Sequence, residues 1–191
     1  MTPLKVHATA STFVFGRFTT GWRLGLIQHP RLKRTMIAGG HVEEFEVPAE
    51  AAVREVLEET GLRVRLLRRP TVPLPQGYPL HVVTDEPWWT TLTDVPGDNH
   101  LAEPHRHLDH QYVAIADSVE HVRTPEHPFG WFGPDDLDEL EMFDDTVCLA
   151  AWIFPHIDQL ADQGLGHTWS LSHAEPESAD LENRSASAES K

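Results

Sequence analysis

The chain has 191 residues, of which 40% are hydrophobic, so its length and composition suit one globular domain with a sizeable core. Its net charge of −15 excludes the basic footprint that binding of long nucleic acid requires, whereas small phosphorylated ligands remain open because a bound metal can reverse the local field. Apolar runs fall short of the roughly 18 residues of a membrane span, no signal-peptide pattern is present, and Cys148 is the single cysteine, so we expect a cytoplasmic protein without a membrane partner.

The N-terminal part of the chain predicts a series of β-strands. Residues 8–15 are β-branched and aromatic, residues 22–28 alternate between apolar and polar, and residues 16–21 between them have the composition of a turn. A short strand at 35–38 then leads into the glycine pair 39–40. We expect the backbone to turn sharply there and to come close to a ligand.

A helix is predicted from residue 48 to residue 60, because Pro48 is tolerated in a first turn and Gly61 is favoured just past a last one. At 100° per residue it has an apolar side with Val53, Val56, Leu57 and Thr60, and an acidic side with Glu55, Glu58 and Glu59. Within the predicted helix no Lys or Arg follows these glutamates by three or four residues, so we expect a divalent cation such as Mg²⁺ to neutralise them. A solvated acidic face is the alternative.

The middle of the chain predicts further strands separated by loops. Residues 63–68, 88–93 and 111–116 have strand patterns, the last of them most clearly. A cluster of prolines within 70–87 predicts a loop with at most a short strand at 81–84.

The C-terminal part predicts helices and then a tail. A helical turn is expected at 134–140 and an amphipathic helix at about 144–160, with Cys148 as a small core residue. The segment 164–191 is rich in Ser, Ala and Glu and is expected to be disordered, which leaves 1–163 as the folded domain.

A histidine-rich stretch follows a predicted turn at 94–99. On a strand, His105, His107 and Asp109 would share one face and could converge on a metal ion or on a phosphate. A separate zinc site is the less favoured alternative, because histidines beside strands are more often solvated or hydrogen-bonded than zinc ligands. Aromatic residues could stack on a nucleobase, although core packing is their more frequent role; they are Trp88, Trp89 and Tyr112.

The spacing within GHVEEFEVPAEAAVREVLEETGL, from Gly40 to Leu62, resembles the signature of Nudix hydrolases at every specified position. The resemblance implies an α/β (α+β) fold, a Nudix-type α/β/α sandwich around a mixed β-sheet. It further implies a pyrophosphohydrolase that uses Mg²⁺ or Mn²⁺ to cleave a nucleoside diphosphate linked to another moiety X, by attack of water at phosphorus. Its partner would be a small-molecule diphosphate, and a homodimer is one alternative for its oligomeric state.

The resemblance also assigns roles to individual residues. It implies a metal site made by Glu55, Glu58, Glu59 and the Gly39 carbonyl, with Gly40 in support. Arg54 would act with these carboxylates and form a pair with Glu46 that orients Glu55. The general base stays open, the candidates being Glu55, Glu103, Glu120 and Glu126. Family members often have Pro in place of Ala38 and Gly in place of Phe45, which puts the path of this loop in doubt. The His-x-His-x-Asp pattern of His105, His107 and Asp109 is similar to one near the substrate cleft of some Nudix-like proteins, so the resemblance implies a substrate-contacting strand there.

Two other hypotheses remain beside the hydrolase. A Nudix-fold sensor without turnover would have no need for the full carboxylate set, whereas an acidic helix without metal would not be stabilised by Mg²⁺ or Mn²⁺. The identity of X depends on loops outside the signature and is left open by the sequence, with a nucleotide preferred.

Overall fold

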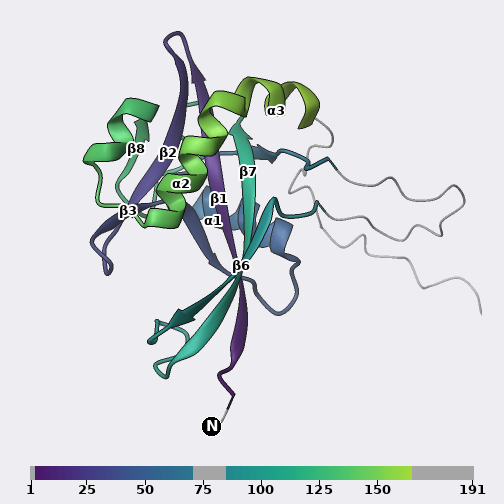
Figure 1. Cartoon of the computed structure of the whole chain (residues 1–191), viewed down its shortest axis with the longest axis vertical. Helices are drawn as coiled ribbons and strands as arrows, with labels where there is room; N and C mark the ends of the chain where they lie inside the picture. The colour runs from purple at the N-terminus through teal and green to yellow at the C-terminus, as the bar shows by residue number, and fades with distance from the viewer. Residues whose placement is uncertain (1–2, 71–84, 165–191) are drawn as a thin grey trace, which may run out of the picture.

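The computed structural model describes residues 3–70 and 85–164 (Figure 1). Its strands are β1 (Val6–Phe18), β2 (Gly21–His29), β3 (Arg34–Met36), β4 (Ala38–His41), β5 (Val64–Leu66), β6 (Trp89–Val95), β7 (His105–Ala116) and β8 (Phe129–Phe132). Its helices are α1 (Pro48–Thr60), η1 (Pro134–Glu139), α2 (Asp144–Ile153), η2 (Phe154–His156) and α3 (Ile157–Gly164), with η marking 3₁₀ turns.

The described strands form one mixed sheet around two long central strands. β1 and β7 pair in parallel, while every other pairing is antiparallel. The path β3-β2-β1-β7-β5 is joined by β4 on β1, β6 on β7 and β8 on β2. β1 is long enough to pair with β4 through residues 9–12 and with β2 through residues 14–18. The start of β4 is thereby held against the middle of the sheet.

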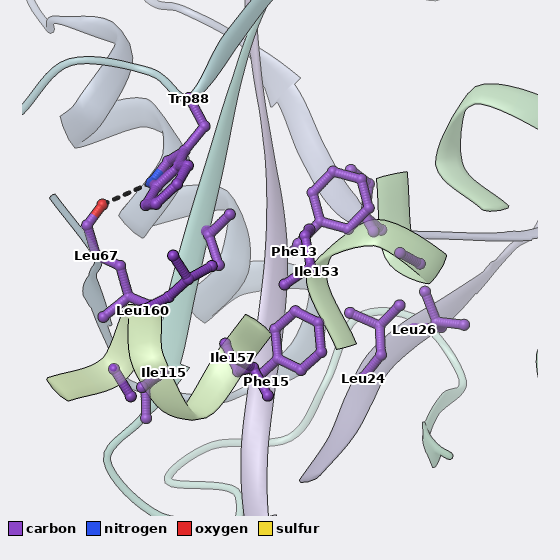
Figure 2. Packing of buried hydrophobic residues seen from close by; sticks show 14 of the residues in the cluster. Phe13, Phe15, Leu24, Leu26, Leu67, Trp88, Ile115, Ile153, Ile157 and Leu160 are labelled. Carbon is purple, nitrogen blue, oxygen red and sulfur yellow. Dashed lines mark hydrogen bonds between the residues drawn. The ribbon is translucent and has the colours of Figure 1, made fainter. Parts of the chain in front are cut away.

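Helices cover both faces of this sheet, which confirms the predicted three-layer sandwich. Because side chains alternate along a strand, Val14 and Ala114 pack under α1, whereas Phe13, Phe15 and Val113 face α2 and α3. The face that packs against α2 and α3 holds the larger hydrophobic cluster (Figure 2). Within it, the Trp88 indole N–H donates to the Leu67 carbonyl at 2.8 Å. Burying each large apolar side chain contributes roughly 1.5–3 kcal/mol.

The ends of α1 follow from local chemistry and agree with the prediction. Pro48 occupies the first turn, and the Glu50 carboxylate accepts the Val47 N–H at 3.0 Å. Gly61 ends the helix with φ at 71°, and its N–H donates to the Leu57 carbonyl at 3.0 Å. A side chain at Gly61 would also collide with the Arg123 carbonyl, so glycine is required by both conformation and space.

Several predicted boundaries are wrong. β1 continues through residues 16–18, and only Thr19 and Thr20 form the turn. Gly39 and Gly40 do not turn sharply but lie in β4, paired with Ser11 and Ala10. Glycine is needed there for close approach, because a Cβ on Gly39 would meet the Ala10 carbonyl at 2.5 Å.

The C-terminal helix also differs from the prediction. It is divided into α2, η2 and α3, and it continues to Gly164. Pro155 lies at the division, where it lacks an N–H for a helical hydrogen bond. Cys148 is exposed rather than part of the core, because α2 turns Thr146, Ala150 and Ile153 inward instead.

Two predictions lie outside the described residues, namely the short strand at 81–84 and the tail beyond residue 164. Among the described helices, none is long and apolar enough to cross a membrane.

Candidate functional site

The three glutamates of α1 differ in their exposure to solvent. The side chain of Glu58 is 37% exposed, that of Glu55 15% and that of Glu59 10%. Glu59 therefore does not lie on a solvated face, which was the alternative to a metal site, but points toward the sheet. There its Oε2 accepts the Gly39 N–H at 2.9 Å, which joins the helix to β4.

Arg54 binds the carboxylates around it. Its guanidinium donates to both oxygens of Glu46, at 3.0 and 2.6 Å, to Glu55 at 2.7 Å and to Glu58 at 3.1 Å. A further N–H reaches the His41 carbonyl at 2.9 Å. The predicted pair of Arg54 with Glu46 is therefore present in the structure. Arg54 also reaches Glu58, which follows it by four residues in the helix.

Burial and crowding leave these carboxylates short of positive charge. Burial raises the pKa of Glu59 to about 8, against the opposing effect of the Gly39 N–H, and the charges of Glu55, Glu126 and Glu58 raise it further. Burial also raises the pKa of Glu55 above its ordinary value, which the hydrogen bond from Arg54 only partly offsets. The Arg54 guanidinium alone therefore does not neutralise the negative charge of the α1 glutamates.

The same residues fit a hard divalent cation. All three side chains offer carboxylate oxygens, which are the ligands that Mg²⁺ and Mn²⁺ prefer. Gly40 leaves space beside them, because a Cβ at this position would collide with the Glu55 carboxylate. Burial alone would raise the pKa of Glu46, but hydrogen bonds from Arg54 and from the Glu43 N–H lower it, so Glu46 stays ionised as the partner of Arg54.

The segment before β8 packs against the end of α1. The N–H groups of Glu126 and His127 donate to the carbonyls of Glu58 and Glu59, at 3.2 and 3.3 Å. His127 Nε2 also lies 3.3 Å from Glu59 Oε1. Of the downstream base candidates, Glu126 is thus held beside the α1 carboxylates.

The two other downstream candidates make different contacts. The Glu103 carbonyl contacts His105, and Glu120 is exposed with its N–H on the Ser118 hydroxyl.

A second group of polar side chains gathers on the opposite face of the sheet. Ala10 and Gly40 are paired and face α1, so the next pair, Thr9 and His41, faces away from it. On that face His41 meets residues of the β6–β7 loop and of β7. The resulting histidine cluster comprises His41, Asp98, His105 and His107, whose ligand atoms all lie within 4.8 Å of one another.

Asp98 is the centre of the histidine cluster. Its Oδ2 lies 3.3 Å from His41 Nε2, 3.2 Å from His105 Nε2 and 3.0 Å from His107 Nε2. Burial lowers the pKa of His41 to about 4, with the neighbouring His100 adding to the effect. Burial alone would raise the pKa of Asp98, but hydrogen bonds from backbone N–H groups and from His107 hold it well below its ordinary value.

The structure brings together only part of the predicted His105, His107 and Asp109 set. Asp109 instead accepts the hydroxyl groups of Thr9 and Ser11, at 2.8 and 2.9 Å. The histidines are joined instead by Asp98, which the sequence assigned to a turn, and by His41 on β4, for which no role was predicted. Asp98 lies seven residues before His105, whereas nothing local in the sequence connects His41 with β7.

The predicted aromatic contacts follow the core interpretation. Tyr112 is 1% exposed and packs under α1, so it does not reach a ligand from solvent in this structure. Trp88 is buried, and Trp89 packs edge-on against Phe13 at 6.3 Å between ring centroids. A cavity of about 520 Å³ lies away from these residues, between the β1–β2 turn and α2, where Trp22 and Phe154 line it.

Comparison with known proteins agrees with this fold. The family model described as NUDIX domain matches residues 7–152. A protein of Lactococcus lactis described as a probable DHNTP pyrophosphohydrolase is 28% identical over 108 residues, which are 56% of this chain and 54% of that protein. The chain thus spans about half the length of this curated relative.

Solved structures are similar as well. A Nudix-family hydrolase from Clostridium perfringens superposes with a TM-score of 0.63 at 24% identity, covering 79% of this chain and 97% of the other. The Escherichia coli dihydroneopterin triphosphate pyrophosphohydrolase superposes with a TM-score of 0.55 at 14% identity, covering 81% and 99%. At these identities the likeness concerns the fold.

Proposed function

This chain belongs to the Nudix family, and we propose that it is a divalent-metal-dependent pyrophosphohydrolase that cleaves a nucleoside diphosphate linked to another moiety X. The observation that carries the proposal is the group of α1 carboxylates beside β4, which is crowded, partly buried and short of positive charge. A sensor without turnover would have no use for this group.

Some residues of this site would bind the metal ion, and others would orient the residues that bind it. Glu55, Glu58 and Glu59 would hold Mg²⁺ or Mn²⁺, which when bound neutralises the diphosphate and activates water. Arg54 fixes Glu55 and Glu58 through its planar guanidinium and is itself held by Glu46 on the other side.

A carboxylate near the reacting phosphorus must also accept the proton of the attacking water. Glu126 supports this role best among the downstream candidates, since its backbone is hydrogen-bonded to the end of α1. Its carboxylate lies 3.2 Å from the Arg123 guanidinium, and that pair is exposed, so Glu126 can change partner when substrate binds.

The substrate class is proposed from the relatives. Two of them are described as pyrophosphohydrolases of dihydroneopterin triphosphate. That compound carries a chain of phosphoanhydride bonds on an organic group, as nucleotides do. It therefore belongs in the test beside nucleoside triphosphates, sugar nucleotides and dinucleoside polyphosphates.

The test is phosphate or pyrophosphate release from this panel, with Mg²⁺ and with Mn²⁺. Glu59→Gln is the inactive comparison, and Glu139→Gln, an exposed site in η1, is the matched control. We expect one substrate class to be hydrolysed by the wild type and the control but not by Glu59→Gln. Full activity in a folded Glu59→Gln variant would refute the assigned site. Silence across the panel, together with a melting temperature raised by Mn²⁺, would favour the sensor.

A further inference from the structure

We propose that the histidine cluster is a second metal site that binds a transition-metal ion of the zinc class, separate from the α1 carboxylates. It draws its ligands from three segments: His41 from β4, Asp98 from the β6–β7 loop, and His105 and His107 from β7. His41 is distant in sequence from the other three ligands. The Nudix signature does not require it.

The spacing of the ligand atoms suits a tetrahedral ion. Zinc binds imidazole nitrogen at about 2.0–2.1 Å, so two ligand atoms of a tetrahedral site lie about 3.3 Å apart. The three nitrogen-to-Asp98 distances are 3.0–3.3 Å, and the two Nε2 atoms of His105 and His107 are 3.0 Å apart. All ligand atoms lie within 4.8 Å of one another, so an ion that enters would draw the wider pairs together.

The hydrogen bonds within the cluster are incomplete without a cation. His105 Nδ1 lies 2.9 Å from the Glu103 carbonyl, which can only accept, so the ring proton of neutral His105 is on Nδ1. Its Nε2 lone pair then faces Asp98 Oδ2 at 3.2 Å, and His105 is fully buried. His41 Nε2 is also buried and has no hydrogen-bond partner among the described residues, because its contact with Asp98 does not have hydrogen-bond geometry. A metal ion would satisfy all of these lone pairs at once.

Outer contacts hold two of the ligands in their orientation. The N–H groups of His100 and Leu101 both donate to Asp98 Oδ1 at 2.8 Å, which directs Oδ2 toward the histidines. The Glu103 carbonyl does the same for His105. A second ring nitrogen bonded to a backbone carbonyl is typical of histidines that bind metals.

The ligand set differs in kind from that of α1. Three imidazoles and one carboxylate suit zinc and related ions, whereas the all-oxygen set of α1 suits Mg²⁺ or Mn²⁺. Four protein ligands complete a tetrahedron and leave no position for substrate, which indicates a structural role. Such an ion would fasten the β6–β7 loop to β4 at His41, whose carbonyl also accepts from Arg54.

The experiment is Co²⁺ binding to the full chain after removal of metals with a chelator, followed by its visible absorption and by displacement with Zn²⁺. Tetrahedral Co²⁺ absorbs far more strongly than the octahedral ion, so this signal is specific for the histidine cluster. We expect one equivalent of Co²⁺ to give this spectrum. In Asp98→Asn and His107→Gln, affinity should fall by at least about 100-fold, because loss of an outer-shell partner alone costs about 10- to 100-fold.

Two variants provide the controls. His110→Gln, on the same strand but outside the cluster, and Glu58→Gln, in the α1 group, should both keep the spectrum and the affinity. His107 is chosen beside Asp98 because its side chain is 22% exposed. We expect its replacement to leave the chain folded, and circular dichroism checks this. The proposal is overturned if the wild type gives no tetrahedral spectrum, if both cluster variants retain it, or if Glu58→Gln abolishes it.

Discussion

Removing the carboxyl group of Glu59 should flatten the pH dependence of stability in the metal-free protein. Burial raises the pKa of this group in the folded state to about 8 from an ordinary 4.5, so the folded chain keeps the proton to higher pH than the unfolded chain does. The free energy of unfolding therefore decreases as the pH rises from the unfolded toward the folded value.

The magnitude follows from the two pKa values. Between pH 6 and pH 8 the unfolded chain has already lost this proton, while the folded chain still holds most of it. Each pH unit in that window costs about 1.4 kcal/mol, less near pH 8, so the wild type should lose about 2 kcal/mol that Glu59→Gln does not lose. The lowered pKa values of His41 and His107 also contribute to the pH dependence of stability, but their effects cancel in the difference between the two proteins.

The assay is urea unfolding at pH 6 and pH 8, with chelator and with saturating Mg²⁺. With chelator, the difference between wild type and Glu59→Gln should change by about 2 kcal/mol, whereas Glu139→Gln should follow the wild type. Mg²⁺ should abolish the loss in the wild type, because a bound cation keeps the carboxylate ionised at little cost. A parallel decrease in wild type and Glu59→Gln would refute the placement of a protonated, buried Glu59 in this site.

Two further substitutions test the environment of the α1 carboxylates. Arg54→Lys keeps the charge but cannot bridge Glu46 and Glu55, so urea unfolding should show a loss of about 2 kcal/mol; an unchanged free energy would contradict the bridging role. Gly40→Ala places a Cβ against the Glu55 carboxylate and should lower metal-dependent hydrolysis at least about tenfold while the chain stays folded. Steady-state kinetics and circular dichroism on the same samples check this, and full activity would mean that Glu55 can move aside without consequence.

Elements whose ends depend on nearby residues agree with their predictions. α1 agrees with its prediction at both ends because Pro48, Gly61 and the spacing of Val53 and Val56 act within a few residues of one another. The boundaries of β1 did not follow from composition, since its last residues are held as a strand by pairing with β2. Where a strand ends depends on its partner as much as on its own residues.

The exposure of single residues was harder to predict than the elements that carry them. Helical spacing grouped Glu59 with Glu55 and Glu58, yet Glu59 points to the sheet because Gly39 on β4 offers it an N–H. Cys148 looked apolar in its context but falls on the exposed side of α2. In both cases the packing of the helix against the sheet decided whether the side chain is exposed. Helical periodicity cannot predict this, because it describes a helix without its neighbours.

The sequence by itself determined the Nudix family, the sandwich around a mixed sheet and the residues of the α1 carboxylate group, because these depend on a continuous stretch with fixed spacing. Only the tertiary structure decided that His41 and Asp98 join His105 and His107, in place of Asp109. Parallel pairing of β1 with β7 and the return of β4 along β1 bring these segments together. Contacts between such distant segments are set by strand register, and no local pattern of residues records it.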